Sequence, residues 1–343
     1  MNSGFNQSNN NNTAYQYTDY NQEKILKSRG EKKAIKIIGS VSGICVIAYV
    51  LLQNAVALPI LFFPALADLF KNSNEFYYLF TIAASVIGLF VPFIIGGNYL
   101  KKRTGTEIYY FDAPKDGALA VLSIPMGFFA CLIGNVLTGY FIAWMESIGL
   151  KLTSPDFNSP KTPSSIILYT IAIAIVPPLV EELAVRGCIM QPLRRYGDLF
   201  AIVATSVLFA VLHGNLVQAP FALFAGLAFG YICCITGSLW PTVIIHCINN
   251  AYSVLDSVLT SGAVMEDKAE YIMVMTQYFF IGLGAVCTLA FFYRARKLNY
   301  RLRKSDTVIR AGEKTAAYFL NIPMIIALII MLIVTSQYIS LMN

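Results

Sequence analysis

Long apolar segments alternate with short polar ones along most of the chain. A segment of about 20 apolar residues is long enough to cross the hydrocarbon core of a bilayer as a helix. The segments lack the period-two alternation that is typical of membrane β-strands, so helices are favoured over a barrel. The pattern predicts an all-α transmembrane bundle of about nine spans, near residues 37–63, 77–100, 117–145, 165–190, 199–215, 219–240, 241–259, 274–293 and 316–342.

Composition supports a membrane protein and sets off one segment from the rest. Hydrophobic residues make up 57% of the chain, charged residues 13%, and mean hydropathy is +0.61, which excludes an ordinary soluble domain. Residues 1–33 are rich in asparagine and poor in aliphatic side chains, so we expect a disordered cytoplasmic tail. Residues 34–343 form the predicted membrane domain, with a catalytic core over 165–260.

Lysine and arginine are concentrated in alternate connecting segments. The segments 24–36, 101–115, 194–195 and 294–314 carry 20 of the 25 basic residues. Because cytoplasmic loops carry an excess of Lys and Arg, we expect the N terminus in the cytoplasm and the C terminus outside. The net charge of +6 follows from this bias and from attraction to anionic lipid, and it gives no support to nucleic-acid binding. The expected location is an integral membrane position, with a bacterial plasma membrane favoured.

Two adjacent acids and the only two histidines of the chain lie within apolar segments. An ionisable side chain at the bilayer centre costs about 2.5–3.5 kcal/mol on insertion scales, so such residues are usually functional. Histidine has the unperturbed pKa nearest neutrality, which suits proton transfer and metal ligation. We therefore predict one polar site inside the membrane, built around Glu181, His213 and His246.

The segment that carries the two acids contains three charged residues, for which we expect different roles. Glu182 and Arg186 are four residues apart with the acid first, which favours an ion pair within one helix. Glu181 is rotated by about 100° from Glu182 on a helix, so we expect it to face a cavity instead. The alternative is that all three charges form one buried structural network. Pro177 and Pro178 lie just upstream and should kink the helix.

Each histidine has a partner four residues away on the same helical face. Phe209 precedes His213 at this spacing, and Asn250 follows His246. A histidine in a membrane helix often serves only as a hydrogen-bonding partner between helices. Both histidines acting in this way beside a pair of acids is the less favoured interpretation. Asn249 is expected to point elsewhere on its helix.

Carboxylate, imidazole and amide groups from three helices would allow two kinds of peptide hydrolysis. In one, a carboxylate and an imidazole take a proton from water, while the second imidazole and the amide stabilise the oxyanion. In the other, Glu181, His213 and His246 hold Zn²⁺, which acidifies a bound water. Neither route forms a covalent intermediate, and the spacing of the residues does not choose between them.

The depth of the three groups in the membrane raises a geometric question. Counting about 1.5 Å per residue places Glu181 and His246 near the cytoplasmic side and His213 deeper. Either the span of His213 begins later than residue 199, or the connection Gly214–Pro220 is irregular and dips into the cavity. Irregular backbone at membrane depth is tolerated only where it lines water or protein.

The three motifs E-E-x-x-x-R, F-x-x-x-H and H-x-x-x-N, in this order, resemble those of the CAAX protease and bacteriocin-processing (CPBP, Abi-type) family. The likeness covers about residues 165–260. It implies that Glu181 activates the attacking water with His213, and that His246 and Asn250 stabilise the tetrahedral intermediate.

The resemblance also implies that Glu182, Arg186 and Phe209 organise the site. Val185 departs from the aromatic residue that often precedes the arginine in the family. A glutamate mechanism that requires no cofactor is favoured, and zinc held by Glu181, His213 and His246 is the alternative.

The resemblance leads to an expected function and expected partners. We expect an intramembrane endopeptidase that cleaves a membrane-associated or lipidated peptide, of CAAX or bacteriocin/leader type, near the cytoplasmic face. Its partners would then be that substrate and the lipid bilayer. One alternative is a non-catalytic bacteriocin self-immunity or scaffold protein that uses the same cavity. Another is a proton-coupled transporter with Glu181 and His213 as a relay, which the lack of a visible internal repeat disfavours.

Overall fold

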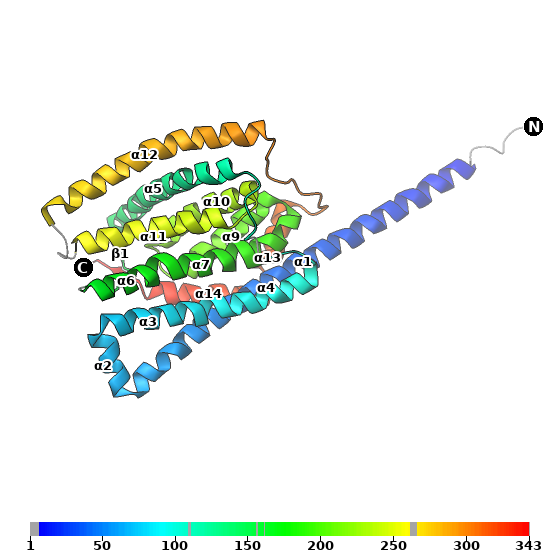
Figure 1. The fold of residues 1–343 in the computed structure, drawn as a ribbon. Helices are drawn as coiled ribbons and strands as arrows, with labels where there is room; N and C mark the ends of the chain where they lie inside the picture. The colour runs from blue at the N-terminus through cyan, green and yellow to red at the C-terminus, as the bar shows by residue number, and fades with distance from the viewer. Residues whose placement is uncertain (1–6, 109–110, 156, 161, 261–265, 343) are drawn as a thin grey trace, which may run out of the picture.

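The computed structural model describes residues 7–342 apart from 109–110, 156, 161 and 261–265, and it is a bundle of helices that run mostly side by side (Figure 1). In chain order the elements are α1 (Gln7–Phe62), α2 (Pro64–Asn72), α3 (Asn74–Ser85), η1 (Val86–Phe90), α4 (Val91–Thr104), α5 (Gly117–Ser147), β1 (Leu150–Leu152), α6 (Pro163–Thr170), η2 (Ile171–Ile175), α7 (Val176–Glu182), η3 (Leu183–Met190), α8 (Gln191–Leu193), η4 (Arg194–Tyr196), α9 (Asp198–Leu212), α10 (Ala219–Thr236), α11 (Trp240–Thr260), α12 (Glu266–Lys297), α13 (Ala311–Phe319), α14 (Ile322–Ser336) and β2 (Ile339–Leu341). Among these, η1, η2 and η3 are π-helical and η4 is a 3₁₀ turn.

The all-α fold is confirmed, and each predicted span coincides with helical structure. By length and apolar composition alone, fewer helices than the predicted nine or so qualify as spans. Within the described residues, six helices are long and apolar enough to cross a membrane, or seven if the bent pair α13–α14 counts as one. Helix α9 falls short because it has 15 residues. Helix α11 is not among the six because polar residues, including His246 and two asparagines, interrupt its apolar sequence.

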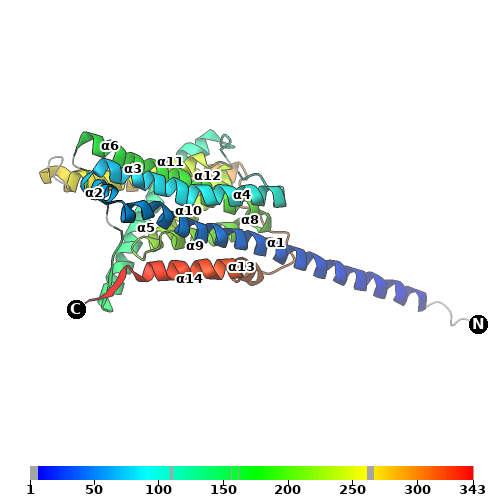
Figure 2. The same cartoon turned by 90° about the horizontal axis from the view of Figure 1, so that it is seen from below.

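Helix α1 extends well beyond the bundle at its N-terminal end (Figures 1 and 2). The disorder of residues 1–33 and the domain boundary at residue 34 stay predictions. Inside the bundle, α1 lies beside α14 and buries Ile35, Ile38 and Val46. Gly43 permits this close approach, because a Cβ there would lie 2.5 Å from backbone atoms of Pro323 and Met324.

Polar contacts join the basic connecting segments at one end of the bundle. The Asp116 carboxylate accepts two hydrogen bonds of 2.7 Å from Arg294, and Arg303 N donates to Asp198 at 2.9 Å. Lys115 N donates to the carbonyl of Thr236, also at 2.9 Å. We call this the basic end, comprising residues 24–36, 101–108, 111–116, 194–198, 236–240 and 294–314.

Other connections meet at the far end, here called the opposite end, comprising residues 63–77, 147–155, 157–160, 162–163 and 337–342. Strands β1 and β2 pair there in antiparallel register, with Lys151 opposite Ser340. Asn74 donates its side-chain amide to the carbonyl of Ser159 at 3.0 Å. The alternation of loops that the charge pattern predicted is therefore present in the structure, and both ends are visible in Figure 1.

Candidate active site

One interrupted helix carries the acids and the arginine. Helices α6, α7 and α8, with the π-helical turns η2 and η3 between them, run continuously from Pro163 to Leu193. Pro177 has no N–H to donate to the carbonyl of Ile173, four residues earlier, where an α-helix would make its bond. Asn250 of α11 supplies the missing donor, because its Nδ2 lies 2.9 Å from that carbonyl. The proline break therefore ties α11 to the helix that carries the acids.

Glu182 and Arg186 form a buried ion pair. Arg186 Nη1 donates to Glu182 Oε1 at 2.8 Å, and the two side chains are 1% and 0% exposed. The guanidinium carbon lies 4.3 Å from the centroid of the Phe209 ring and 5.5 Å from that of Phe229. Cation–π attraction strengthens when the cation is desolvated, as it is here. Phe209 thus supports the arginine from the neighbouring helix α9.

His246 lies between the two adjacent acids. Its Nδ1 is 3.1 Å from Glu182 Oε1, and its Nε2 is 3.8 Å from Glu181 Oε2. A carboxylate that pairs with Arg186 can only accept, so Nδ1 carries a proton, and in the neutral tautomer Nε2 is an acceptor. In that tautomer, two acceptors face each other across 3.8 Å. A water molecule that donates one hydrogen to each would satisfy both.

His213 lies at the C-terminal end of α9, where a tight connection follows. Its Nδ1 is 2.8 Å from the carbonyl of Phe209, an acceptor, so Nε2 is the free acceptor of the neutral ring. Gly214 follows with φ of +61°, a left-handed conformation that glycine adopts without strain. The Asn215 side chain then accepts from Gln218 N at 2.9 Å and donates to the carbonyl of His213 at 2.9 Å.

The connection between α9 and α10 decides between the two explanations for the depth of His213. Helix α9 begins at Asp198, so the expectation of a later start is wrong. The short connection between α9 and α10 contributes His213 and Gln218 to the walls of cavities, so irregular backbone does line the site.

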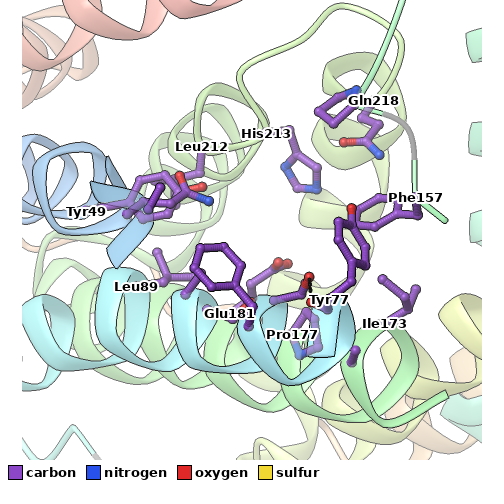
Figure 3. Close-up of a pocket in the computed structure, with 18 of the residues that line it drawn as sticks. Tyr49, Tyr77, Leu89, Phe157, Ile173, Pro177, Glu181, Leu212, His213 and Gln218 are labelled. Carbon is purple, nitrogen blue, oxygen red and sulfur yellow. Dashed lines mark hydrogen bonds between the residues drawn. The ribbon is translucent and has the colours of Figure 1, made fainter. Parts of the chain in front are cut away.

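Two cavities adjoin at His213. The larger has a volume of about 540 Å³, and Glu181 and His213 lie on its walls from α7 and α9 (Figure 3). The smaller has a volume of about 220 Å³ and is lined by His246 and Asn250. Phe209, His213 and Gln218 line both. The predicted site residues therefore gather around two neighbouring spaces rather than in one.

Asn249 differs from the sequence-based expectation. It is 6% exposed, lines the smaller cavity, and donates its side-chain amide to Asn250 Oδ1 at 3.2 Å. Adjacent positions on a helix can both border a cavity when it lies at the edge between their faces. With Oδ1 of Asn250 accepting from Asn249, and one amide hydrogen given to Ile173, a second amide hydrogen remains for a ligand.

The placement of these side chains does not fit a metal ion. Over the part of the chain that the structure describes, no group of three or more His, Cys, Asp or Glu residues could hold one. Zinc requires its ligands to converge at about 2.0–2.2 Å from one point. The set Glu181, His213 and His246 is therefore not assembled as a zinc site in this arrangement.

Several lining residues lie far from the three motifs in the sequence. Tyr49 and Gln53 of α1 border the larger cavity, and Thr138 of α5 borders the smaller. Thr138 is 6% exposed, and its hydroxyl has no hydrogen-bond partner among the described atoms. The spacing of Tyr49, Gln53 and Thr138 in the sequence does not mark them as site residues. The one sequence feature that marks them is a polar side chain inside an apolar span.

Comparison with known proteins agrees with the motifs. Residues 163–252 match the family described as type II CAAX prenyl endopeptidase Rce1-like. The matched segment contains all three motifs, so the resemblance to the CAAX protease family is confirmed over this part of the chain. No match was found among curated proteins or among solved structures.

Proposed function

We propose, from the match of residues 163–252 to CAAX endopeptidases and from the site geometry, that the protein is an intramembrane endopeptidase acting on membrane-associated or lipidated peptides. The observation that carries the proposal is the gap of 3.8 Å between Glu181 Oε2 and His246 Nε2. With Glu181 ionised and His246 neutral, two acceptors at this spacing would hold one water with a lone pair free for attack. Glu181 borders a cavity large enough for a short peptide segment.

Glu182 acts in this proposal as a positioning residue. It fixes the tautomer and orientation of His246 through the 3.1 Å contact with Nδ1, and Arg186 fixes Glu182 in turn. A carboxylate that orients a histidine in this way raises the basicity of the other ring nitrogen. The role of His246 therefore differs from the one that the resemblance implied, since it orients the water together with Glu181.

The reaction follows from these positions. The oxygen of the held water attacks the scissile carbonyl carbon, and one water proton passes to the Glu181 carboxylate. The tetrahedral intermediate then collapses as the carbon–nitrogen bond breaks. Glu181 returns its proton to the departing amine, so the products are an amine and a carboxylic acid, which keeps the second water proton until it ionises, and the Glu181 carboxylate is regenerated. We propose that this route requires no cofactor.

The developing oxyanion requires hydrogen-bond donors on the other side of the carbonyl. Asn250 has a second amide hydrogen beyond the one given to Ile173. His213 borders both cavities, and its Nε2 would become a donor on protonation. Removing one such donor costs about 10²–10³-fold in turnover in well-studied hydrolases, which gives the scale to test.

The test is cleavage by purified protein in detergent of a quenched prenylated CAAX peptide and of a mixed peptide library. Wild type is compared with Glu181→Gln and His246→Ala, each with and without a chelator. Glu146→Gln is the matched control, because Glu146 is exposed at the end of α5 and lines neither cavity.

The expected result is a loss of about 10²-fold or more in both site variants, with the control and the chelated wild type unchanged. Loss with chelator would instead favour the zinc mechanism. A folded wild type that cleaves neither substrate, while binding a peptide in the cavity, would favour the immunity or scaffold role.

A further inference from the structure

The larger cavity reaches one end of the bundle only. Beyond the catalytic groups, its walls come from the last turns of α1 inside the bundle, from α2 and α3, and from the loop after β1. Phe70, Tyr77, Pro155 and Phe157 belong to the opposite end, and Tyr77 and Phe157 are visible at the right of the cavity in Figure 3. None of its described lining residues belongs to the basic end.

The helical segment that connects Glu181 to the basic end is buried throughout. Every residue from Glu182 to Arg194 is buried, over the whole length of η3 and α8. Leu183, Ile189 and Leu193 contribute to the largest apolar core. A substrate peptide therefore has no path to Glu181 along this helix from the basic end.

The walls also restrict the chemistry of the occupant. Glu181 is the one carboxylate among the described lining residues of the larger cavity, and neither lysine nor arginine lines it. The other walls are aromatic rings, aliphatic side chains such as Leu89 and Leu212, and uncharged polar groups such as Gln53. A free C-terminal carboxylate would meet neither a lysine nor an arginine here, and burying an unpaired charge is costly. An uncharged internal peptide segment fits these walls better.

Charge assigns the two ends to the two sides of the membrane. The basic end contains 20 of the 25 lysines and arginines, and loops rich in these residues stay in the cytoplasm. We propose that the enzyme takes an uncharged segment of its substrate from the extracytoplasmic side of the membrane. This inference rests on the proposed endopeptidase function and replaces the expectation of cleavage near the cytoplasmic face. The substrate class is then an exported peptide, or the outer segment of a membrane-anchored protein.

The test uses bacterial membrane vesicles of the two orientations, each containing the full chain. The probe is a quenched, uncharged peptide segment with a charged polymer at one end, which prevents it from crossing the bilayer. Detergent-solubilised aliquots of both preparations measure total activity. Separately, Phe157→Cys and Lys304→Cys are exposed in intact cells to a thiol reagent that does not cross membranes. Both positions are exposed side chains, at the opposite end and the basic end respectively.

We expect right-side-out vesicles to cleave the probe at least tenfold faster than inside-out vesicles, with equal rates after detergent. We also expect labelling of Phe157→Cys in intact cells, and of Lys304→Cys only after lysis. Faster cleavage by inside-out vesicles, or cleavage only after detergent, would overturn the inference. Absence of cleavage in detergent would count against the endopeptidase itself, and the labelling would then decide separately whether the cavity faces outwards.

Discussion

Replacing Arg186 with methionine should destabilise the fold far more than loss of an exposed charge. The substitution keeps an unbranched side chain against Phe209 but removes the cation that pairs with Glu182 at 2.8 Å. Glu182 is 0% exposed, so water cannot replace that partner. Its carboxylate would lose the arginine and keep the contact with His246.

The magnitude follows from this burial. Removing one partner of a buried ion pair costs about 3–5 kcal/mol, because the other charge stays buried and uncompensated. Each 1.4 kcal/mol changes an equilibrium constant tenfold, so about 4 kcal/mol lowers the ratio of folded to unfolded protein by roughly a thousandfold. The double variant Glu182→Gln, Arg186→Met removes both charges. It should be more stable than Arg186→Met alone, since buried pairs are often replaced by neutral residues at little cost.

The assay is the free energy of unfolding of the purified protein, from titration of mixed micelles with a denaturing detergent. Lys101→Met is the matched control, because its ion pair with Glu107 at 2.7 Å is solvent-exposed at 39% and 69%. Such surface pairs contribute about 0–1 kcal/mol. A loss below about 1 kcal/mol in Arg186→Met, or a double variant no more stable than the single one, would refute the reasoning.

Three further predictions concern other contacts. Hydrogen bonds from Arg294 lower the pKa of Asp116 to about 2. Its stabilising effect is therefore complete above the ordinary aspartate pKa of about 3.9 and is lost as pH falls towards 2. Asp116→Asn should therefore reduce the pH dependence of the melting temperature between pH 4 and 2. Asn250→Leu leaves the Ile173 carbonyl without its donor and should lower the free energy of unfolding by about 1–3 kcal/mol. The loss should be smaller in a Pro177→Ala background, where the alanine restores a backbone N–H. Unfolding titrations of the wild type, the two single variants and the double variant measure the difference. Gly226→Val would place a Cβ 3.0 Å from Ser206 and should lower the melting temperature, whereas Gly139→Ala, with nothing within 4 Å, should not.

The helices could be predicted from the sequence because span length and apolar composition are local properties. The pair Glu182–Arg186 could also be predicted, since a spacing of four residues on one helix fixes which side chains meet. The motifs located the segment that the family comparison then matched. Length and apolar composition alone do not identify α9 and α11 as spans, because a helix surrounded by protein needs neither full membrane length nor continuous apolar sequence.

Contacts between helices could not be obtained in this way. The spacing of His246 on α11 does not reveal that its ring lies between Glu181 and Glu182 of another helix. The bond from Asn250 to Ile173 likewise depends on how α11 packs against the proline break. Tyr49 reaches the cavity from a helix more than 100 residues earlier in the chain. Each of these contacts is set by packing across large sequence separations, which motif spacing does not encode.

The small β1–β2 pair has a consequence for the order in which the enzyme is built. Thr153, two residues before the cavity-lining Pro155, donates its backbone N–H to the carbonyl of Tyr338 at 2.9 Å. The ribosome must therefore pass residue 338, and α14 must insert, before this wall of the cavity is braced. Glu181 and His246 are synthesised long before that point. The nascent chain thus holds its catalytic groups first and gains the surface that presents a peptide to them last.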